Sequence, residues 1–270
     1  MIHSMRDKKY LNILSHSIRV CQNYQPKLGR GKDDGYSLAE FRQLYQSDPF
    51  YHWMGLDHPL MYAAHKAAGG MTSIYRQIGL GCEHVFRAIL QDTLHLSEKE
   101  VAWSYTIPTS QGKTRTLSLD GRIPFEAVKD DKQRSRIGAW LNESCERLEI
   151  DQDIRHSLKG IVFEVRQGYK SKDSKRQNAD LANAVTAYTK GYLPCVVIFS
   201  QQIDQDIALR YSAEKWKLLT GILEKASSHE SVYIFMRDII GYDLAGFFER
   251  NSAALKKEIQ NVLESLLATT

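Results

Sequence analysis

The chain has 270 residues and a mass of 30.9 kDa, and 36 Lys and Arg side chains against 32 Asp and Glu side chains give a net charge of +4. Apolar residues make up 43% and charged residues 25%, a balance typical of soluble globular chains that excludes disordered, collagen-like and low-complexity classes. Neither a run of roughly 18 apolar residues nor an apolar N-terminal signal segment occurs, so we expect a cytoplasmic protein with no membrane partner.

Residues 1 to about 70 are rich in aromatic residues and are expected to be irregular apart from two short helices. Ser37, with Glu40 three positions later, has the pattern of a capping box that begins a short helix. A second helix is expected from Pro59, and the pair Gly69-Gly70 is expected to end it.

The rest of the chain alternates between helical and strand patterns. In chain order, we expect a helix over 72–94, strands over 101–107 and 113–119, a helical region over 128–158, a strand over 160–167, a helix over 177–189, a strand over 193–200, a helix over 212–225, a strand over 232–236 and a terminal helix over 252–267. These elements predict an α/β fold in which a mixed sheet of about five strands is flanked by helices. We place a helical N-terminal subdomain in residues 1–70, and the core with its C-terminal helix in residues 71–270.

The four cysteines, Cys21, Cys82, Cys145 and Cys195, lie far apart in the sequence and form no CxxC pair. This spacing excludes a zinc ribbon and a thioredoxin-like motif. In a chain without a secretion signal, such cysteines are typical of reduced, partly buried small hydrophobic residues.

Two acidic residues and one basic residue carry the clearest chemical pattern. Asp120 follows the strand over 113–119, and Glu164 lies in an apolar strand, where a charge is costly without a partner. Arg166 shares a face with Glu164, because side chains on a strand alternate with a period of two. Two carboxylates at one edge of a sheet repel each other unless a cation relieves them, and Mg²⁺ prefers such oxygen ligands. A cation beside them would stabilise a phosphate.

The order of these features resembles the PD-(D/E)xK nuclease superfamily, and in particular the type II restriction endonucleases. The resemblance covers residues 72–236. It implies that Asp120 and Glu164 bind Mg²⁺ and that Glu83, on the preceding helix, supports the metal or its water. It also implies a restriction-endonuclease-like core and double-stranded DNA as the substrate.

The lysine of that family pattern is replaced here by Arg166, which cannot lose its proton to act as a base. By resemblance, Arg166 or Lys170 would hold the scissile phosphate, and Lys170 or Lys172 would fold back into the role of the lysine. Leu119 stands where the family has a proline.

A basic segment follows the candidate catalytic strand. Residues 166–176 hold five basic side chains and one acidic side chain, an excess of four that equals the net charge of the whole chain. Lys and Arg suit guanine in the major groove, and Asn and Gln suit adenine. We therefore expect DNA contacts from Lys170, Lys172, Asp173, Ser174, Lys175, Arg176, Gln177 and Asn178. The segment also resembles the base-reading segment of restriction enzymes that cut CCGG-containing sites.

These features predict a Mg²⁺-dependent type II restriction endonuclease that makes sequence-specific double-strand breaks in DNA and leaves 5′-phosphate ends. Because palindromic DNA mirrors a two-fold protein, we expect a homodimer, with the terminal helix either packed on the core or forming the interface. We expect no small-molecule substrate. Two alternatives stay open: a repair or recombination nuclease of the same fold that recognises DNA structure, and a non-catalytic DNA-binding protein.

Each of these features also has a simpler interpretation. Asp120 and the glycine after it fit a turn at the end of a strand, and Glu164 fits an ordinary ion pair with Arg166. Glu83 fits a structural role, and the charged run over 166–176 fits a solvated loop.

Overall fold

The computed structural model describes residues 2–28, 33–108, 113–168 and 183–268, and the chain divides into two compact units. Unit 1 comprises Met1–Gly81 and Glu249–Thr270, and unit 2 comprises Cys82–Phe248. We expected a boundary near residue 70, with the terminal helix in the core. The end of that helix instead belongs to unit 1, because its apolar face packs there against other helices.

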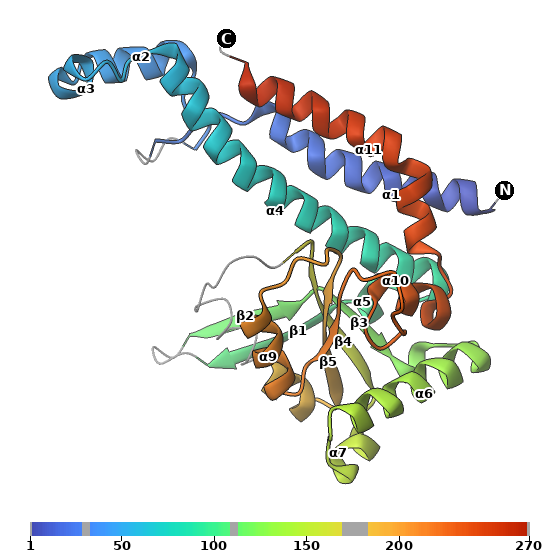
Figure 1. Ribbon diagram of the computed structural model, residues 1–270. Coiled ribbons are helices and arrows are strands. Elements are labelled where there is room, and N and C mark those ends of the chain that lie inside the picture. Colours follow the sequence, from blue (N-terminus) through green and yellow to red (C-terminus); the bar gives the residue numbers. More distant parts are fainter. Residues whose placement is uncertain (1, 29–32, 109–112, 169–182, 269–270) are drawn as a thin grey trace. The chain divides into compact units, whose positions relative to one another are not determined.

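Helices are the only regular elements among the described residues of unit 1 (Figure 1). Its elements are α1 (Ile2–Arg19), the 3₁₀ helix η1 (Val20–Asn23), α2 (Leu38–Gln46), α3 (Pro49–Trp53), the first part of α4 (Pro59–Leu94) and the last part of α11 (Leu244–Leu267). The helices α1, α4 and α11 share one apolar cluster of Ile18, Cys21, Ile74, Val262 and Leu266. Two ion pairs, Arg19–Glu258 and Arg250–Asp7, tie α11 to α1.

The capping box predicted for the short helix α2 is confirmed. The Ser37 hydroxyl accepts a hydrogen bond from the Glu40 amide at 3.3 Å, and the Glu40 carboxylate accepts one from the Ser37 amide at 2.9 Å. This reciprocal pair satisfies two amide groups that the first turn of a helix leaves without a backbone partner.

The predicted break at Gly69-Gly70 is wrong, because α4 continues through both residues to Leu94. A Cβ atom at Gly70 would lie 2.6 Å from the Leu266 side chain, and one at Gly69 would lie 1.9 Å from the Tyr24 hydroxyl oxygen. These glycines therefore allow close packing inside unit 1, at the cost in helix propensity that glycine always carries.

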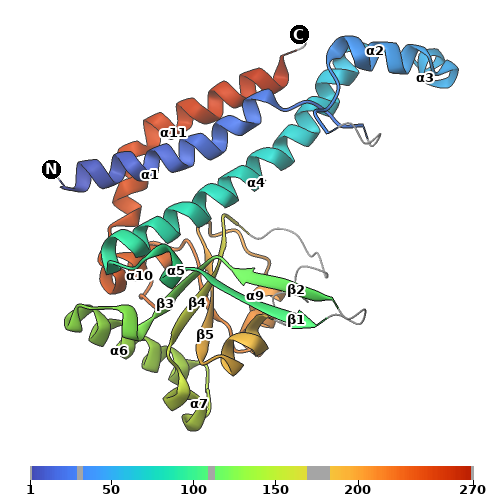
Figure 2. The ribbon, with the colours of Figure 1, turned by 180° about the vertical axis from the view of Figure 1, so that it is seen from behind.

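Unit 2 contains a mixed sheet of four strands in the order β3-β4-β5-β6, of which Figure 2 labels β3, β4 and β5. The strands are β3 (Gly121–Pro124), β4 (Gly160–Arg166), β5 (Tyr192–Ile198) and β6 (Lys217–Leu219). β3 runs antiparallel to β4, whereas β4, β5 and β6 are parallel to one another. A separate antiparallel ribbon is formed by β1 (Trp103–Pro108) and β2 (Thr114–Leu119). The expected mixed sheet is thus confirmed in outline, with the hairpin standing apart from it.

Helices cover both faces of the four-stranded sheet. One face, which includes Val162 and Val196, packs with Trp103 and Leu119 of the ribbon and with Ala187 of the helix over 183–189. The other face presents Phe163, whose ring lies 5.0 Å from Phe86 on α4 and 6.0 Å from Phe235. The remaining helices of unit 2 are α5 (Glu98–Val101), η2 (Phe125–Ala127), α6 (Asp131–Arg147), α7 (Gln152–Ser157), α9 (Gln205–Ala213), α10 (Val232–Phe235) and the π-helical turn η3 (Met236–Ile240).

Two predicted elements near the end of the core are wrong. The segment 232–236, expected to be a strand, is helical, because the Ser231 side chain accepts a hydrogen bond from the Ile234 amide and begins a helix there. The helix expected over 212–225 is α9, which begins earlier, at a cap formed by Asp204, and gives way to β6 after Lys215 adopts a positive φ of 59°.

The four cysteines are free and buried, as the spacing in the sequence predicted. Among the described helices of at least 18 residues, none has a stretch apolar enough to cross a membrane.

Replacing Gly70 by alanine is expected to lower the free energy of unfolding by about 1–2 kcal/mol, because overlap with Leu266 outweighs the gain in helix propensity. Gly138 on α6 is the matched control, since nothing lies within 4 Å of a Cβ atom built there. Gly138→Ala should therefore stabilise the chain by about 0.5–1 kcal/mol. Urea denaturation measures both effects, and equal stabilisation by the two variants would contradict the close packing at Gly70.

Candidate active site

Asp120 occupies the point where the chain passes from the ribbon to the four-stranded sheet. It is the single residue between β2 and β3, where the chain bends, so the strand ends at Asp120 as predicted and a second strand begins at Gly121. The register of β3 and β4 pairs Gly121 with Phe163, and the Asp120 amide donates to the Phe163 carbonyl at 2.8 Å. Continuing this register by one residue sets Asp120 opposite Glu164.

The Asp120 side chain is itself part of the strand pairing. Its Oδ2 atom accepts a hydrogen bond of 2.7 Å from the Val165 amide, which lies directly after Glu164. The Asp120 carbonyl accepts a second hydrogen bond, of 2.9 Å, from Nε of Arg87 on α4. The acid is therefore held to β4 by its carboxylate and to the helix by its backbone.

Glu164 and Arg166 project from the same face of β4, as the alternation of the strand predicts. Nη2 of Arg166 lies 2.7 Å from Oε1 of Glu164, and only about a tenth of each side chain is exposed. The ion pair between Glu164 and Arg166, which was the simpler interpretation of Glu164, is therefore present in the structure. Because the pair is buried, removing either partner would leave a charge without compensation.

Glu83 reaches the same region from α4. Its Oε1 atom lies 2.8 Å from Nη2 of Arg87, one helical turn later, so a single guanidinium group binds both Glu83 and the Asp120 carbonyl. Sequence reasoning missed Arg87, although its spacing of four residues from Glu83 is the signal of an ion pair on a helix face.

The environment disfavours a negative charge on Asp120. Burial, and after it the neighbouring Glu83 carboxylate, raise the pKa of Asp120 to about 6, against the opposing effects of the Val165 amide, Arg166 and Arg87. Burial and Arg87 lower the pKa of His84, while Asp120 raises it. All of these groups act on Asp120 or its neighbours, so Glu83, Asp120, Arg87 and Arg166 form one electrostatic cluster.

With Glu164, the partner of Arg166, the cluster has three carboxylates and two guanidinium groups. Carboxylate oxygens suit Mg²⁺, which commonly takes one or two carboxylates and completes its shell with water. Asp120 and Glu164, which the strand register sets opposite each other, are the two that would hold such an ion. Within the described part of the chain, no group of three or more His, Cys, Asp or Glu side chains is arranged to hold a metal ion.

The predicted base-reading residues lie outside the described residues. They are Lys170, Lys172, Asp173, Ser174, Lys175, Arg176, Gln177 and Asn178. The described chain ends at residue 168, just after β4, and resumes in the helix over 183–189. Tyr188 in this helix donates a hydrogen bond of 2.5 Å to the Lys215 carbonyl, which is a packing role.

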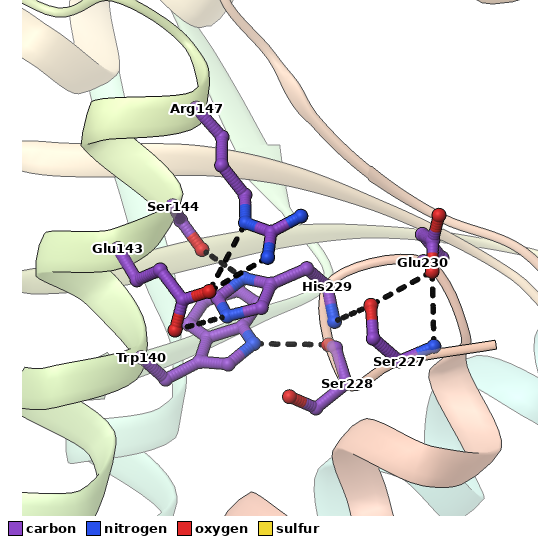
Figure 3. Close-up of polar contacts among 8 residues, drawn as sticks. All are labelled: Trp140, Glu143, Ser144, Arg147, Ser227, Ser228, His229 and Glu230. Carbon is purple, nitrogen blue, oxygen red and sulfur yellow. Dashed lines mark hydrogen bonds and ion pairs between the residues drawn. The ribbon is translucent and has the colours of Figure 1, made fainter.

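A second polar cluster, which sequence reasoning did not find, joins α6 to the segment 227–230 (Figure 3). Nδ1 of the buried His229 lies 3.1 Å from the Ser144 hydroxyl, and Nε2 lies 3.0 Å from a Glu143 carboxylate oxygen. The His229 ring stacks on Trp140 with a centroid separation of 5.4 Å, and Trp140 Nε1 donates to the Ser228 carbonyl at 2.9 Å.

The sequence of contacts from Ser144 through His229 to Glu143 has the chemical types of a nucleophile, a base and a carboxylate. Ser144 is fully buried, however, so its hydroxyl has no surface from which to meet a substrate. Burial and the nearby Lys217 lower the pKa of His229, which favours the neutral ring that such a buried contact requires. We assign this cluster to holding the segment 227–230 on α6.

Comparison with known proteins gives no relative. No protein-family model, no curated protein and no solved structure matches the chain.

Replacing Asp120 by asparagine is expected to stabilise the chain at neutral and alkaline pH. The pKa of Asp120 is about 6 in the folded chain and about 4 in an unfolded one, so the folded state holds more protons between these values and loses stability as the pH rises. Asparagine carries no charge, and its amide oxygen can still accept the hydrogen bond from Val165. The gain in the free energy of unfolding should be on the order of 1–3 kcal/mol at pH 8 and should shrink toward zero at pH 4.

Thermal or urea denaturation of wild type and Asp120→Asn across this pH range measures the difference. Asp131→Asn is the control, because the Asp131 side chain is 86% exposed on α6 and should change stability little at any pH. A gain for Asp120→Asn that did not vary with pH would contradict the buried-charge explanation.

Proposed function

We propose that the chain is a Mg²⁺-dependent nuclease that cuts both strands of DNA at a specific sequence and leaves 5′-phosphate ends, as type II restriction endonucleases do. The observation that carries the proposal is the position of Asp120 opposite Glu164, with Arg166 beside Glu164 and Glu83 reaching the same place. The order of elements supports it: a helix, the ribbon, β3, an insertion that contains α6 and α7, then β4, a further helix and β5. This is the order that a restriction-endonuclease-like core would have.

The charges of the cluster support the binding of a divalent cation at Asp120 and Glu164. Three carboxylates outnumber two guanidinium groups, and the pKa of Asp120 is raised by burial first and by the Glu83 carboxylate second. A divalent ion at Asp120 and Glu164 would relieve the repulsion among the carboxylates. When bound, Mg²⁺ supplies Lewis-acid stabilisation of the phosphate oxygens.

The protein groups around Asp120 have separate tasks in this proposal. Arg166 has the fixed fork of donors that suits a phosphate, and it would hold the scissile group. Arg87 orients Glu83 and the Asp120 backbone together, so Glu83 would position a water close to the phosphate. Lys170 remains the predicted second cation of the site.

The ribbon offers a surface that suits DNA. Ser104 pairs with Ser118 and Thr106 with Thr116, and all four hydroxyl side chains are exposed. The opposite face of the ribbon is buried through Trp103 and Leu119, so the hydroxyl face is left to solvent. A two-stranded ribbon fits the major groove, where Ser and Thr contact bases or phosphates. Because β2 leads directly into Asp120, DNA lying on the ribbon would be close to the carboxylates.

Loss of either central acid is expected to abolish cleavage and to spare binding. Asp120→Asn and Glu164→Gln should each lower the cleavage rate by about 1,000-fold or more, since each removes a charge that the metal requires. Asp131→Asn should cut like wild type. The assay is digestion of phage DNA with Mg²⁺, followed by sequencing of the ends, with binding measured separately in Ca²⁺.

The same digestion separates the alternatives. Discrete fragments with one end sequence support site-specific cleavage, whereas a smear or a preference for branched DNA indicates a nuclease that recognises structure. Wild-type protein that binds DNA but never nicks it would be a non-catalytic DNA-binding protein. Cleavage that survives in Asp120→Asn and Glu164→Gln would remove these residues from the active site.

The basic segment should account for much of the salt dependence of binding. Lys172→Ala and Arg176→Ala should each weaken DNA binding and reduce the slope of log K against log salt concentration by about 0.9, as expected for one lost phosphate contact. Lys132→Ala, on the exposed side of α6, should leave the slope unchanged. A slope unchanged in the first two variants would place those side chains on bases or in solvent.

A further inference from the structure

The end of unit 1 that carries α3 exposes an unusual amount of apolar surface. Phe50, Tyr51, Trp53, Met54 and Leu60, which we name the apolar tip, have exposed fractions of 61%, 39%, 79%, 62% and 64%. They are five of the sixteen large apolar side chains that are exposed among the described residues, yet they fall within eleven consecutive positions. Isolated exposed apolar residues are normal, but such clustering marks an interaction surface.

Hydrogen bonds and aromatic packing hold the apolar tip in place on unit 1. Asp48 caps α3 by accepting hydrogen bonds from the amides of Phe50 and Tyr51 at 3.0 and 3.2 Å. The Tyr51 ring lies 4.9 Å from Tyr45, which belongs to a buried aromatic cluster with Phe41 and Tyr62. Phe50, Trp53 and Met54 follow the three- and four-residue steps of one helix face. Figure 1 shows α2 and α3 beyond the N-terminal end of α4, within unit 1.

The charges around the apolar tip argue for a protein partner. Residues 37–60 carry three acidic side chains, Glu40, Asp48 and Asp57, against one arginine, Arg42. This acidic balance would repel the phosphates of nucleic acid and the anionic headgroups of a membrane. The acidic excess is small, and Asp57 lies 3.0 Å from His52, so this excess opposes the dense negative charge of DNA or an anionic lipid surface more than it opposes a second copy.

The area of the apolar tip fits pairing with a second copy. The five side chains expose on the order of 600 Å² of surface, which is the upper end for the largest patch of a typical monomer. Two such tips facing each other would bury about 1,200 Å², which is where specific protein interfaces begin. Burying an identical patch on both chains closes a two-fold dimer and leaves no unpaired tip.

The other expected interface is already occupied. The apolar residues of the terminal helix were expected to pack on the core or to join two chains. In α11, Val262 and Leu266 are buried against Ile18 and Ile74 of unit 1, and Leu255 and Ile259 pack against the same cluster. This face is not available to a second copy.

We infer that the apolar tip is a self-association surface, at which α3 of one chain packs against α3 of a second copy. Phe50, Trp53 and Met54 form the centre of the contact, and the acidic side chains lie at its border. The inference stands independently of the proposed nuclease activity, because it involves no residue of the Asp120 cluster and no DNA.

The test is the mass of the full chain in solution by light scattering over a range of concentrations, without DNA. Wild type should have the mass of two protomers, and the Trp53→Ser, Met54→Ser double variant should dissociate with a constant raised by roughly 100-fold. Leu209→Ser is the matched control, because Leu209 on α9 is 66% exposed but lies outside the apolar tip. Circular dichroism should show the same helix content in all three proteins.

A covalent test locates the contact directly. All four native cysteines are buried, so Met54→Cys introduces the one exposed thiol, and mild oxidation should yield a disulfide-linked dimer in high yield. Leu209→Cys should not yield one. A wild-type chain that stays monomeric at about 100 µM would overturn the inference. So would a double variant that remains dimeric, since the interface would then lie elsewhere, and so would a monomer that binds neutral phosphatidylcholine vesicles through Trp53.

Discussion

The hydrogen bond from the Val165 amide to the Asp120 carboxylate lies where the ribbon and the four-stranded sheet meet. There a side chain, not a backbone carbonyl, receives an amide of the central strand β4. The acid is thereby drawn into the sheet, beside Glu164 and away from solvent, although its pKa shows that this position disfavours its charge. The junction of the two sheets and the position of the carboxylate are one feature, so the fold cannot keep the first and move the second freely.

Four of the charged groups at this junction form two ion pairs, and the two partners of each pair come from the same helix or strand. Glu83 and Arg87 are neighbours on α4, and Glu164 and Arg166 are neighbours on β4. Asp120 brings no cation from its own segment, because Arg122, two positions later, donates to the carbonyls of Lys99 and Glu100 instead. The Asp120 carboxylate is therefore the one of the three that has no cation from its own segment to balance its charge. A group kept in this state by the fold, at a cost in stability, is typical of a functional site.

Sequence reasoning succeeded where the pattern is local. The capping box at Ser37, the buried strands β4 and β5 and the shared face of Glu164 and Arg166 all depend on spacings of two to four residues or on short apolar runs. Sequence reasoning failed where contacts between residues far apart in the chain determine the local structure. The pair Gly69-Gly70 predicts a helix break, because no local signal shows that Leu266 packs against Gly70. The segment after Ser231 has the composition of a strand, but the Ser231 side chain caps a helix there. Residues 85 positions apart form the Ser144–His229 contact, which no local pattern reveals.

The net charge of the chain includes contributions of opposite sign from two segments. Residues 166–176 hold the whole excess of positive charge, whereas residues 37–60, which carry the apolar tip, are acidic. Nucleic acid would be attracted to the first segment and repelled by the second, and this leaves the apolar tip to a protein. The two segments also belong to different units, since residues 166–176 fall in unit 2 and α3 is in unit 1. If the two proposals hold, DNA binding and self-association would use different units, because a single surface could not favour both phosphate and an apolar partner.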